Sequence, residues 1–320
     1  MKCFVMKKAS ILAFFVITSF ILLPINSTYS QPMWHSNTAT IETSEMVIRF
    51  FNKQPHYMFW IPGENNTAVY IVKFLEIIEF LDKNADGVYS SGDTILARAQ
   101  LLEASVNWNI TAETLSGPQD SVEVRITMQA QVPVLGMMPG GSIGHVNVIF
   151  VNHIYDKDVD VNGYVVEGNK ELKIDVIIEN WPWVNENSLL ALGIIFAGHF
   201  RGKHGVPHME HHRVRENVRE VRMRCEEGAF EGAFRYREEV QIREESGNRT
   251  EKVKASEDFS AHSAIMYLVY PHFEGVLTHD PSVLVIKPTG DVLSLIQSYL
   301  VYIVIATVVI VGAVILIKRK

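Results

Sequence analysis

The segment Val122-Glu123-Val124-Arg125-Ile126-Thr127-Met128-Gln129-Ala130-Gln131-Val132 alternates apolar and polar side chains without interruption. Such alternation is the pattern of a half-buried β-strand, because successive side chains of a strand point to opposite faces of the sheet. The same alternation returns in residues 172–179 and 230–242. Short apolar runs suited to inner strands complete the pattern, at 146–155, 189–196, 265–270 and 283–286.

Turn sequences separate these predicted strands. They are rich in glycine, proline and asparagine: Ser116-Gly117-Pro118, Met138-Pro139-Gly140-Gly141, Asn162-Gly163 and Gly247-Asn248. Many short strands at this spacing predict an all-β protein built as an antiparallel β-sandwich. About 260 residues are enough for one large sandwich or two small ones, and a sub-boundary near residues 155–163 would separate the two.

One segment combines the signals of a helix and of a strand. Within Val69–Leu81, polar Lys73, Glu76 and Glu79 recur at every third position, which suits an amphipathic helix. The β-branched and aromatic content of the same segment suits a strand. We favour the strand.

The first 30 residues have the pattern of a signal peptide. Three lysines precede an uncharged run from Ala9 to Ile25, and Thr28-Tyr29-Ser30 places small residues where a signal peptidase would cut. The sequence therefore predicts a signal peptide at 1–30. An uncleaved N-terminal anchor is the alternative.

A second apolar run lies near the other end. No charged residue occurs from Val292 to Ile317, and Lys318-Arg319-Lys320 follows. About 20 apolar residues span a bilayer, and basic residues beside a span stay on the cytoplasmic side. We therefore expect a C-terminal transmembrane helix at 298–317, a cytoplasmic tail at 318–320 and an extracytoplasmic β-rich body at 31–290. A buried strand pair is the alternative for the apolar run.

The body is acidic and nearly free of cysteine. Three of the 29 basic residues lie in the signal peptide and three in the tail, so the body carries 23 basic against 36 acidic side chains, a formal charge of −13. Such a surface repels phosphate backbones, which argues against a nucleic-acid partner, and it attracts divalent cations. Cys225 is the one cysteine of the body. A prokaryotic protein outside the cytoplasm fits a body without internal disulfides.

One twelve-residue segment carries the ligand pattern of a calcium site. Gly87 stands at the turn position, and an oxygen is available at each of the six ligand positions, from Asp82, Asn84, Asp86, the Val88 carbonyl, Ser90 and Asp93. The segment resembles an EF-hand loop, and its terminal aspartate makes it similar to the dockerin type. The resemblance covers residues 82–93 only and implies Ca²⁺ as a cofactor. A polar turn that binds nothing is the alternative.

A second segment, Asp158–Gly163, matches the first half of the same pattern. Asn162-Gly163 is also a strong hairpin signal, and the later ligand positions lack suitable side chains, so we favour a turn there.

Gly140–Gly144 matches the G-x-S-x-G string of serine hydrolases. That motif needs a helix after the serine, whereas a strand pattern follows here, so a turn is again favoured.

Five histidines lie between His199 and His212. His204, His208 and His211 would share one face if Pro207 opened a helix, and such a cluster suits the metal of an extracytoplasmic hydrolase. The arginine-rich segment 201–224 lacks apolar spacing, and we interpret it instead as a solvated excursion between strands.

Trp181 and Trp183 flank a proline. Two tryptophans in this arrangement either stack on sugar faces, as in a carbohydrate-binding module, or fill the end of a sandwich.

Three Asn-x-Thr triplets, at Asn65, Asn109 and Asn248, are candidate glycosylation sites.

The whole chain diffusely resembles uncharacterised archaeal membrane-anchored surface proteins, a resemblance that implies no activity. The sequence favours a non-enzymatic cell-surface protein with a calcium-stabilised ectodomain and a structural, adhesive or ligand-binding role. Its expected partners are the membrane and a cell-surface protein or glycan. The metal-dependent hydrolase and the carbohydrate-binding module are the two alternatives.

Overall fold

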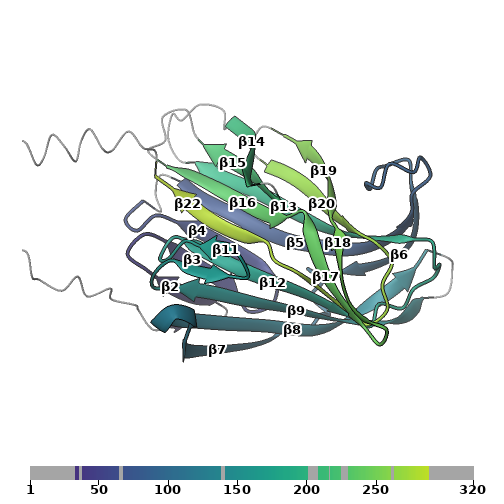
Figure 1. The fold of residues 1–320 in the computed structure, drawn as a ribbon, viewed down its shortest axis with the longest axis horizontal. Coiled ribbons are helices and arrows are strands. Elements are labelled where there is room, and N and C mark those ends of the chain that lie inside the picture. The colour runs from purple at the N-terminus through teal and green to yellow at the C-terminus, as the bar shows by residue number, and fades with distance from the viewer. Residues whose placement is uncertain are drawn as a thin grey trace, which may run out of the picture.

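The computed structural model describes residues 33–35, 38–64, 68–137, 141–200, 208–215, 217–224, 230–260 and 263–287 (Figure 1). This part of the chain is almost entirely antiparallel β-structure, which confirms the all-β prediction. Its one helical element is the short 3-10 turn η1 (Pro118–Asp120). None of its helices is long and apolar enough to cross a membrane. The predicted signal peptide and transmembrane helix lie outside the described residues.

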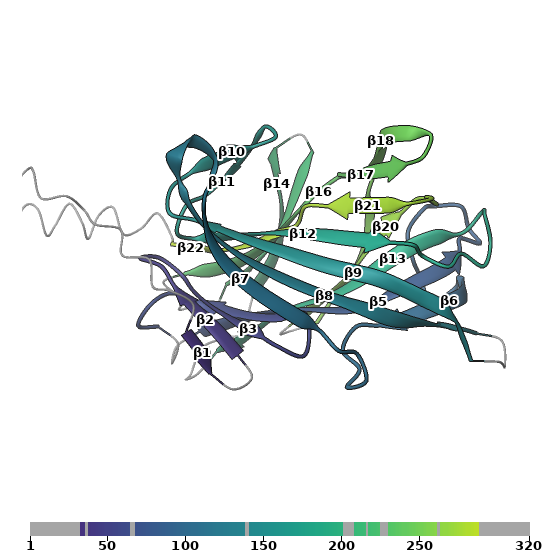
Figure 2. The same ribbon diagram turned by 90° about the horizontal axis from the view of Figure 1, so that it is seen from below.

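The strands form two layers that face each other (Figures 1 and 2). The first layer has the order β1-β2-β3-β4-β5-β13-β20-β19. Its strands are β1 (Met33–His35), β2 (Thr38–Glu42), β3 (Val47–Phe51), β4 (His56–Trp60), β5 (Ala68–Leu81), β13 (Leu189–Phe200), β20 (Ser263–Tyr270) and β19 (Lys254–Phe259).

The second layer begins with the order β7-β8-β9-β12 and then divides. These strands are β7 (Asn109–Ser116), β8 (Val122–Gly136), β9 (Ser142–Tyr155) and β12 (Glu171–Glu179). The first part of β12 pairs with β22 (Ser282–Ile286), which leads to β16 (Glu231–Arg237), β15 (Val218–Arg224) and β14 (His208–Arg215). The second part of β12 pairs with β21 (Val276–His279), which leads to β17 (Glu239–Glu244) and β18 (Gly247–Lys252).

Two smaller elements complete the architecture. Strand β6 (Thr94–Gln100) pairs with β5 of the first layer and with the end of β8 in the second, so the layers are hydrogen-bonded to each other along one side. The β10 (Val159–Val161) and β11 (Tyr164–Val166) hairpin turns at Asn162-Gly163, where both residues have positive φ. The region near 155–163 therefore forms a small hairpin, and β9 and β12 pair directly on either side of it.

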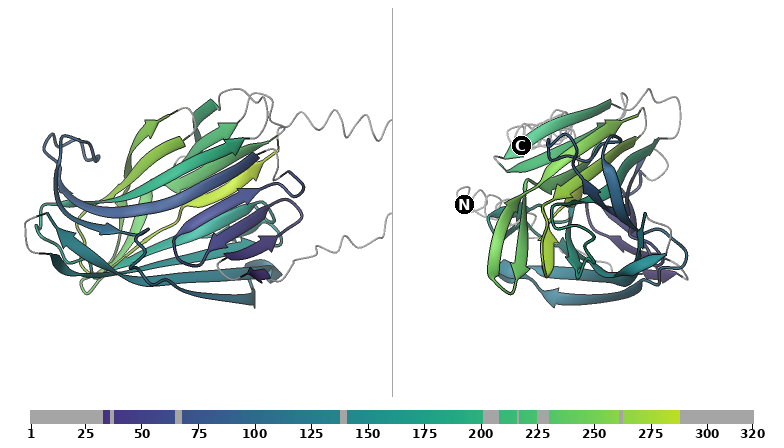
Figure 3. Two further views of the ribbon diagram at one scale, coloured as in Figure 1. Left: turned by 180° about the vertical axis from the view of Figure 1, so that it is seen from behind. Right: turned by 90° about the vertical axis from the view of Figure 1, so that its right-hand side faces the viewer.

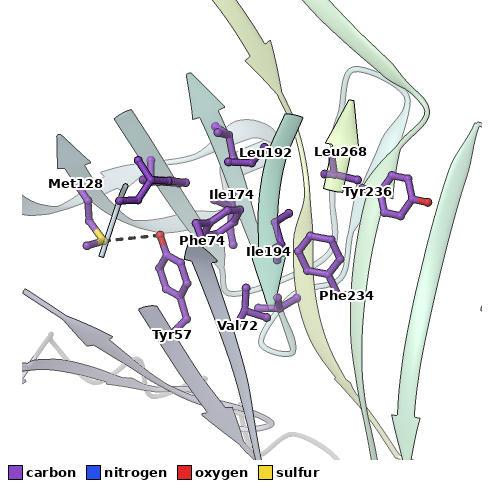
Figure 4. Close-up of a cluster of buried hydrophobic side chains, with 14 of the residues drawn as sticks. Tyr57, Val72, Phe74, Met128, Ile174, Leu192, Ile194, Phe234, Tyr236 and Leu268 are labelled. Atoms are coloured by element: carbon purple, nitrogen blue, oxygen red, sulfur yellow. Dashed lines mark hydrogen bonds between the residues drawn. The ribbon is translucent and has the colours of Figure 1, made fainter. Parts of the chain in front are cut away.

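A single large cluster of buried apolar side chains fills the space between the layers, with members from both halves of the chain (Figure 4). Phe74 on β5 and Phe150 on β9 come from opposite layers, and their ring centroids lie 4.7 Å apart. Tyr57 directs its hydroxyl at the sulfur of Met128, 3.7 Å away, across the same core. Burial of this extent is the dominant favourable term in folding.

The ambiguous segment 69–81 is strand β5, as favoured from its composition. Its third-position polar pattern has a structural cause. The pairing with β13 passes from Phe74 directly to Glu76 and skips Leu75, so a β-bulge shifts the face of every later residue by one position. Lys73 and Glu76 consequently fall three apart without any helix.

Residues 201–224 differ from the prediction of a solvated excursion. The described part of this segment forms β14 and β15, which extend the second layer at its edge. The inner face of β15 carries buried Val221 and Met223. Its outer face carries buried Glu220, and a charged residue in this place obscures the apolar pattern in the sequence.

The described chain starts and finishes at the same end of the body (Figure 3). Strands β1 and β22 lie at this end. The loops that follow β5 and β12 lie at the opposite end, so the calcium-like segment and the Trp-Pro-Trp segment are both remote from the chain ends (Figures 1 and 3).

Candidate functional site

The calcium-like segment, residues 82–93, is the loop that joins the paired strands β5 and β6. The chain turns sharply inside it, since Ala85 and Gly87 have φ values of 58° and 76°. Glycine is favoured at such positions because it lacks a Cβ. The flanking elements are strands, so the loop carries the ligand spacing of an EF-hand without its two helices.

The side chains of the loop turn back on its own backbone. Asp82 Oδ2 accepts a hydrogen bond from Gly87 N at 2.6 Å, and Asp86 Oδ1 accepts one from Val88 N at 2.9 Å. The two ends of the loop are joined by Asp93, whose carboxylate accepts from Lys83 N at 3.1 Å and from Ser90 N at 2.7 Å. Burial acts to raise the pKa of Asp93, but these hydrogen bonds outweigh it and lower that pKa.

One carboxylate oxygen of the loop accepts no hydrogen bond. Asp82 Oδ1 is buried and has no hydrogen-bond partner. A buried oxygen without a donor is costly, and a cation would remove that cost. Across the described residues, no three His, Cys, Asp or Glu side chains lie close enough together to hold a metal as they stand. Calcium binding would therefore require Asp86 and Asp93 to exchange hydrogen bonds for the ion.

The loop is fastened to the first layer by an aromatic contact and by a lysine. The Tyr89 ring packs against Phe80 and Tyr267, with centroid separations of 5.1 and 4.7 Å. Lys254 Nζ, from edge strand β19, donates to the Asp86 carbonyl at 2.6 Å. A Cβ added to Gly87 would stand 2.4 Å from that ammonium, so the glycine also makes room for the lysine. A cationic group therefore already lies against one side of the loop.

The Trp-Pro-Trp segment is organised by a buried carboxylate that the sequence did not reveal. Glu79 is fully buried and receives hydrogen bonds from four groups of the β12–β13 loop: Trp181 Nε1, Val184 N, Asn185 N and Ser188 Oγ. The donor–acceptor distances run from 2.6 to 3.1 Å. The loop is thus wrapped around a single acceptor.

The two tryptophans are consequently engaged within the protein. Trp181 is 5% exposed and belongs to the main core. Trp183 is half-buried, donates to the Phe273 carbonyl at 2.6 Å and packs on His272 with a ring-centroid separation of 4.1 Å. These contacts leave little of either indole for a ligand.

The described histidines of the 199–212 cluster lie on strands, not on a helix. His199 is on β13, whereas His211 and His212 are consecutive on β14 and point to opposite faces. His211 Nε2 lies 3.0 Å from Glu257, and His212 Nε2 lies 3.1 Å from Glu210. Each of these two therefore has its own carboxylate partner, and His204 lies outside the described residues.

The remaining candidate motifs fall in turns and strands. Asp160 Oδ1 accepts from Gly163 N at 2.7 Å, which closes the β10–β11 turn as favoured. Ser142 begins strand β9, so no helix follows the G-x-S-x-G string. Asn109 and Asn248 are exposed on β7 and β18, while Asn65 lies outside the described residues.

A buried ionic cluster lies between the second layer and the β10–β11 hairpin. Arg235, 8% exposed, contacts Glu220 through Nε and reaches Glu171 at 3.4 Å and Glu167 at 2.9 Å through Nη1. Burial raises the pKa of Glu171, and Arg235 counteracts it. The residues of this ionic cluster are separated in the sequence, so no local sequence pattern predicts the cluster.

A second cluster surrounds His153 on the same outer face. Its Nδ1 lies 2.8 Å from Glu123, and its Nε2 lies 3.1 Å from Asp175. Burial lowers the pKa of His153, and the hydrogen bond with Glu123 opposes that shift. Both clusters tie neighbouring strands together by charge rather than by apolar contact.

Comparison with known proteins adds no family. The sequence matches no protein-family model and no curated protein.

Proposed function

We propose that this protein is a single-pass cell-surface protein whose β-sandwich body is stabilised by calcium at the 82–93 loop, with a structural or adhesive role. The observation that carries the metal part of the proposal is Asp82 Oδ1, a buried carboxylate oxygen without a donor in a loop that has an oxygen at every ligand position.

Asp82, Asn84, Asp86, Ser90 and Asp93 would supply side-chain oxygens, and Val88 would supply its carbonyl. Calcium accepts 6 to 8 oxygen ligands, and extracellular sites work at about 10⁻⁴–10⁻³ M. An ion present at a hundredfold excess over its dissociation constant stabilises the folded state by about 2.7 kcal/mol. That contribution is comparable with a disulfide, which the body lacks.

The arrangement of the body suits an anchored protein. Strand β22, the last described strand, lies toward the end of the body opposite the loop that follows β5 (Figure 1). With the proposed anchor at 298–317, the calcium loop would face away from the membrane, toward the medium that supplies the ion. The acidic surface would attract that ion further.

Thermal unfolding of the full chain in detergent tests the calcium site. We expect calcium to raise the melting temperature relative to a chelator, and Asp86→Ala to abolish the rise. Glu186→Ala is the matched control, because it removes one exposed acid outside the loop. Equal melting temperatures with calcium and with chelator would refute the site.

Protease treatment of intact cells tests the location. An extracytoplasmic body is cleaved on intact cells, while a body inside the cell is cleaved only after lysis. The second result would remove the cell-surface part of the proposal and leave the calcium measurement to stand on its own.

A further inference from the structure

A polar groove of about 430 Å³ lies on the outer face of the second layer, where β12, β21, β17 and β18 run side by side (Figure 2). It is remote in the sequence from the 82–93 loop and uses neither tryptophan. Volumes of this order are typical of small-molecule sites. Three strands of its floor, β12, β21 and β17, are hydrogen-bonded on both sides, so a ligand there must be recognised by side chains and not by strand addition.

The strand register aligns side chains of this outer face in two rows that cross the sheet, and the members on β18, β17, β21 and β12 line the groove. Residues opposite one another in antiparallel strands share a face, with Cβ atoms about 5 Å apart. The first row is Asn248, Arg243, Val276, Glu179, Asn147 and Gln131. The second row is Thr250, Gln241, Thr278, Ile177, Ile149 and Gln129.

The composition of these rows is amide and hydroxyl around a small apolar centre. An amide side chain offers a carbonyl acceptor and two N–H donors, and a threonine hydroxyl both donates and accepts. Neighbouring hydroxyl groups of a sugar have the same dual character. Half-buried Ile177 and Val276 supply an apolar surface for the C–H face of a sugar ring.

One lining side chain, Glu179, is held in place by hydrogen bonds from neighbouring strands outside the groove. Gln129 Nε2 donates to Asn147 Oδ1 at 3.2 Å, and Asn147 Nδ2 donates to Glu179 Oε2 at 2.6 Å. This chain orients the Glu179 carboxylate through one oxygen and leaves Oε1 available as an acceptor. Arg243, one strand beyond Val276 in the same row, brings a guanidinium with five donors to the other side. An acceptor and a donor of full charge thus stand on opposite sides of the apolar centre.

We propose that this groove binds an oligosaccharide, with Gln241, Arg243 and Glu179 as its polar contacts and Ile177 as part of the apolar floor. The proposal is independent of calcium at the 82–93 loop. Recognition of a peptide by strand addition is less suited to the floor strands β12, β21 and β17, because each of them is already paired on both sides.

The sugar has two sources. Asn248 and Thr250 belong to an Asn-x-Thr triplet and also line the groove. A glycan attached to Asn248 would therefore reach the site within the same molecule, where its effective concentration is high. A glycan on another molecule is the second source, and the experiment must separate the two.

The full chain is prepared in detergent from a host without N-glycosylation and from a host that glycosylates Asn248. Both preparations are applied to an array of defined neutral and uronic-acid-containing oligosaccharides. The test variant is Gln241→Ala with Thr278→Val, which removes hydrogen-bonding groups from an outer face. Gln54→Ala is the control, since this amide lies outside the groove.

We expect the unglycosylated protein to bind at least one oligosaccharide, the double variant to bind it at least tenfold more weakly, and the control to bind as the parent does. Equal binding by both preparations assigns the groove to a glycan of another molecule. Binding by the unglycosylated protein alone assigns it to the Asn248 glycan. A blank array, or binding that the double variant leaves unchanged, overturns the proposal, and unchanged melting of the variant guards against misfolding.

Discussion

The carboxylate of Glu79 on β5 accepts a hydrogen bond from the indole Nε1 of Trp181 at 3.0 Å, across 102 positions of sequence. The same carboxylate holds three further donors of the β12–β13 loop. A buried acceptor of full charge is thus the centre around which this loop is built. Removal of the Glu79 carboxylate should therefore detach the whole β12–β13 loop from β5.

Glu79→Gln should lower the free energy of unfolding by about 2–3 kcal/mol. The amide presents an N–H₂ group to donors that need an acceptor, and hydrogen bonds to charged groups contribute about 1.5–3 kcal/mol. Urea unfolding followed by tryptophan fluorescence measures the change, because Trp181 reports on the site. Glu186→Gln is the control, an exposed glutamate on the same loop. A midpoint equal to that of the parent would show that the Glu79 contacts contribute nothing.

Arg235→Met should destabilise the fold by about 3–5 kcal/mol, because it leaves the buried carboxylate of Glu171 without a cation and leaves Glu220 with Arg222 alone. Arg222→Met is the comparison. Arg222 contacts the same Glu220, but its side chain is 31% exposed and water can replace it. Chemical denaturation of both variants measures how much free energy of unfolding each one loses. Equal losses in Arg235→Met and Arg222→Met would contradict the role assigned to Arg235.

Stability should fall with acid below pH 6.5, partly through His279. Burial lowers the pKa of His279 to about 4, against the small opposing effect of a hydrogen bond to the Arg237 carbonyl. The unfolded chain takes up a proton at this histidine near pH 6.5, whereas the folded chain does not. The contribution of neutral His279 to the free energy of unfolding is therefore complete above pH 6.5 and is lost as the pH falls toward 4. Between pH 7 and pH 5 the loss is about 2 kcal/mol.

Urea unfolding of the parent and of His279→Gln at pH 7 and pH 5 isolates this effect. The difference between the two pH values should be smaller in the variant. His212→Gln is the control because His212 lies at the surface of β14. Burial also lowers the pKa of His56 to about 4. The His279→Gln variant should therefore keep part of the pH dependence of the free energy of unfolding. Parallel pH profiles of parent and His279→Gln would disprove the assignment.

Gly232→Ala should destabilise the protein by about 2 kcal/mol or more. A Cβ at Gly232 would lie 2.3 Å from the ring of Tyr70, which is completely buried and cannot move away. Gly92→Ala is matched to it, since the nearest atom there is 3.7 Å away. Melting temperatures of the two variants decide the point, and a Gly232→Ala protein as stable as Gly92→Ala would contradict the packing.

The fold class followed from local periodicity because most strands of this protein bury one face only. The alternation in 122–132 and 172–179 corresponds to β8 and β12. Periodicity failed where polar groups are buried. Glu220 interrupts the apolar pattern of β15, and its reason, Arg235 on the neighbouring strand, lies 15 positions away. The bulge at Leu75 puts Lys73 and Glu76 on one face at a helix-like spacing of three, and the sequence alone does not show it because register depends on the partner strand. Glu79 lies on the opposite face, where it accepts the hydrogen bond of Trp181.

Whether the sequence alone proposes a site depends on whether the residues of that site are contiguous. The 82–93 loop is contiguous, so its spacing alone proposes a ligand. The polar groove joins residues of β12, β17, β18 and β21, and only strand register shows that they share one face. The tryptophan pair was visible in the sequence, but its partner Glu79 was not.

The unequal attachment of β1 and β22 gives the body a mechanical polarity. Strand β1 has three residues and, among the described strands, pairs with β2 alone, so a pull on that side unzips its few hydrogen bonds one after another. Strand β22 lies between β12 and β16, so tension applied at Lys287 must shear two ladders together. If the body is tethered through that side, the firmer attachment bears the load.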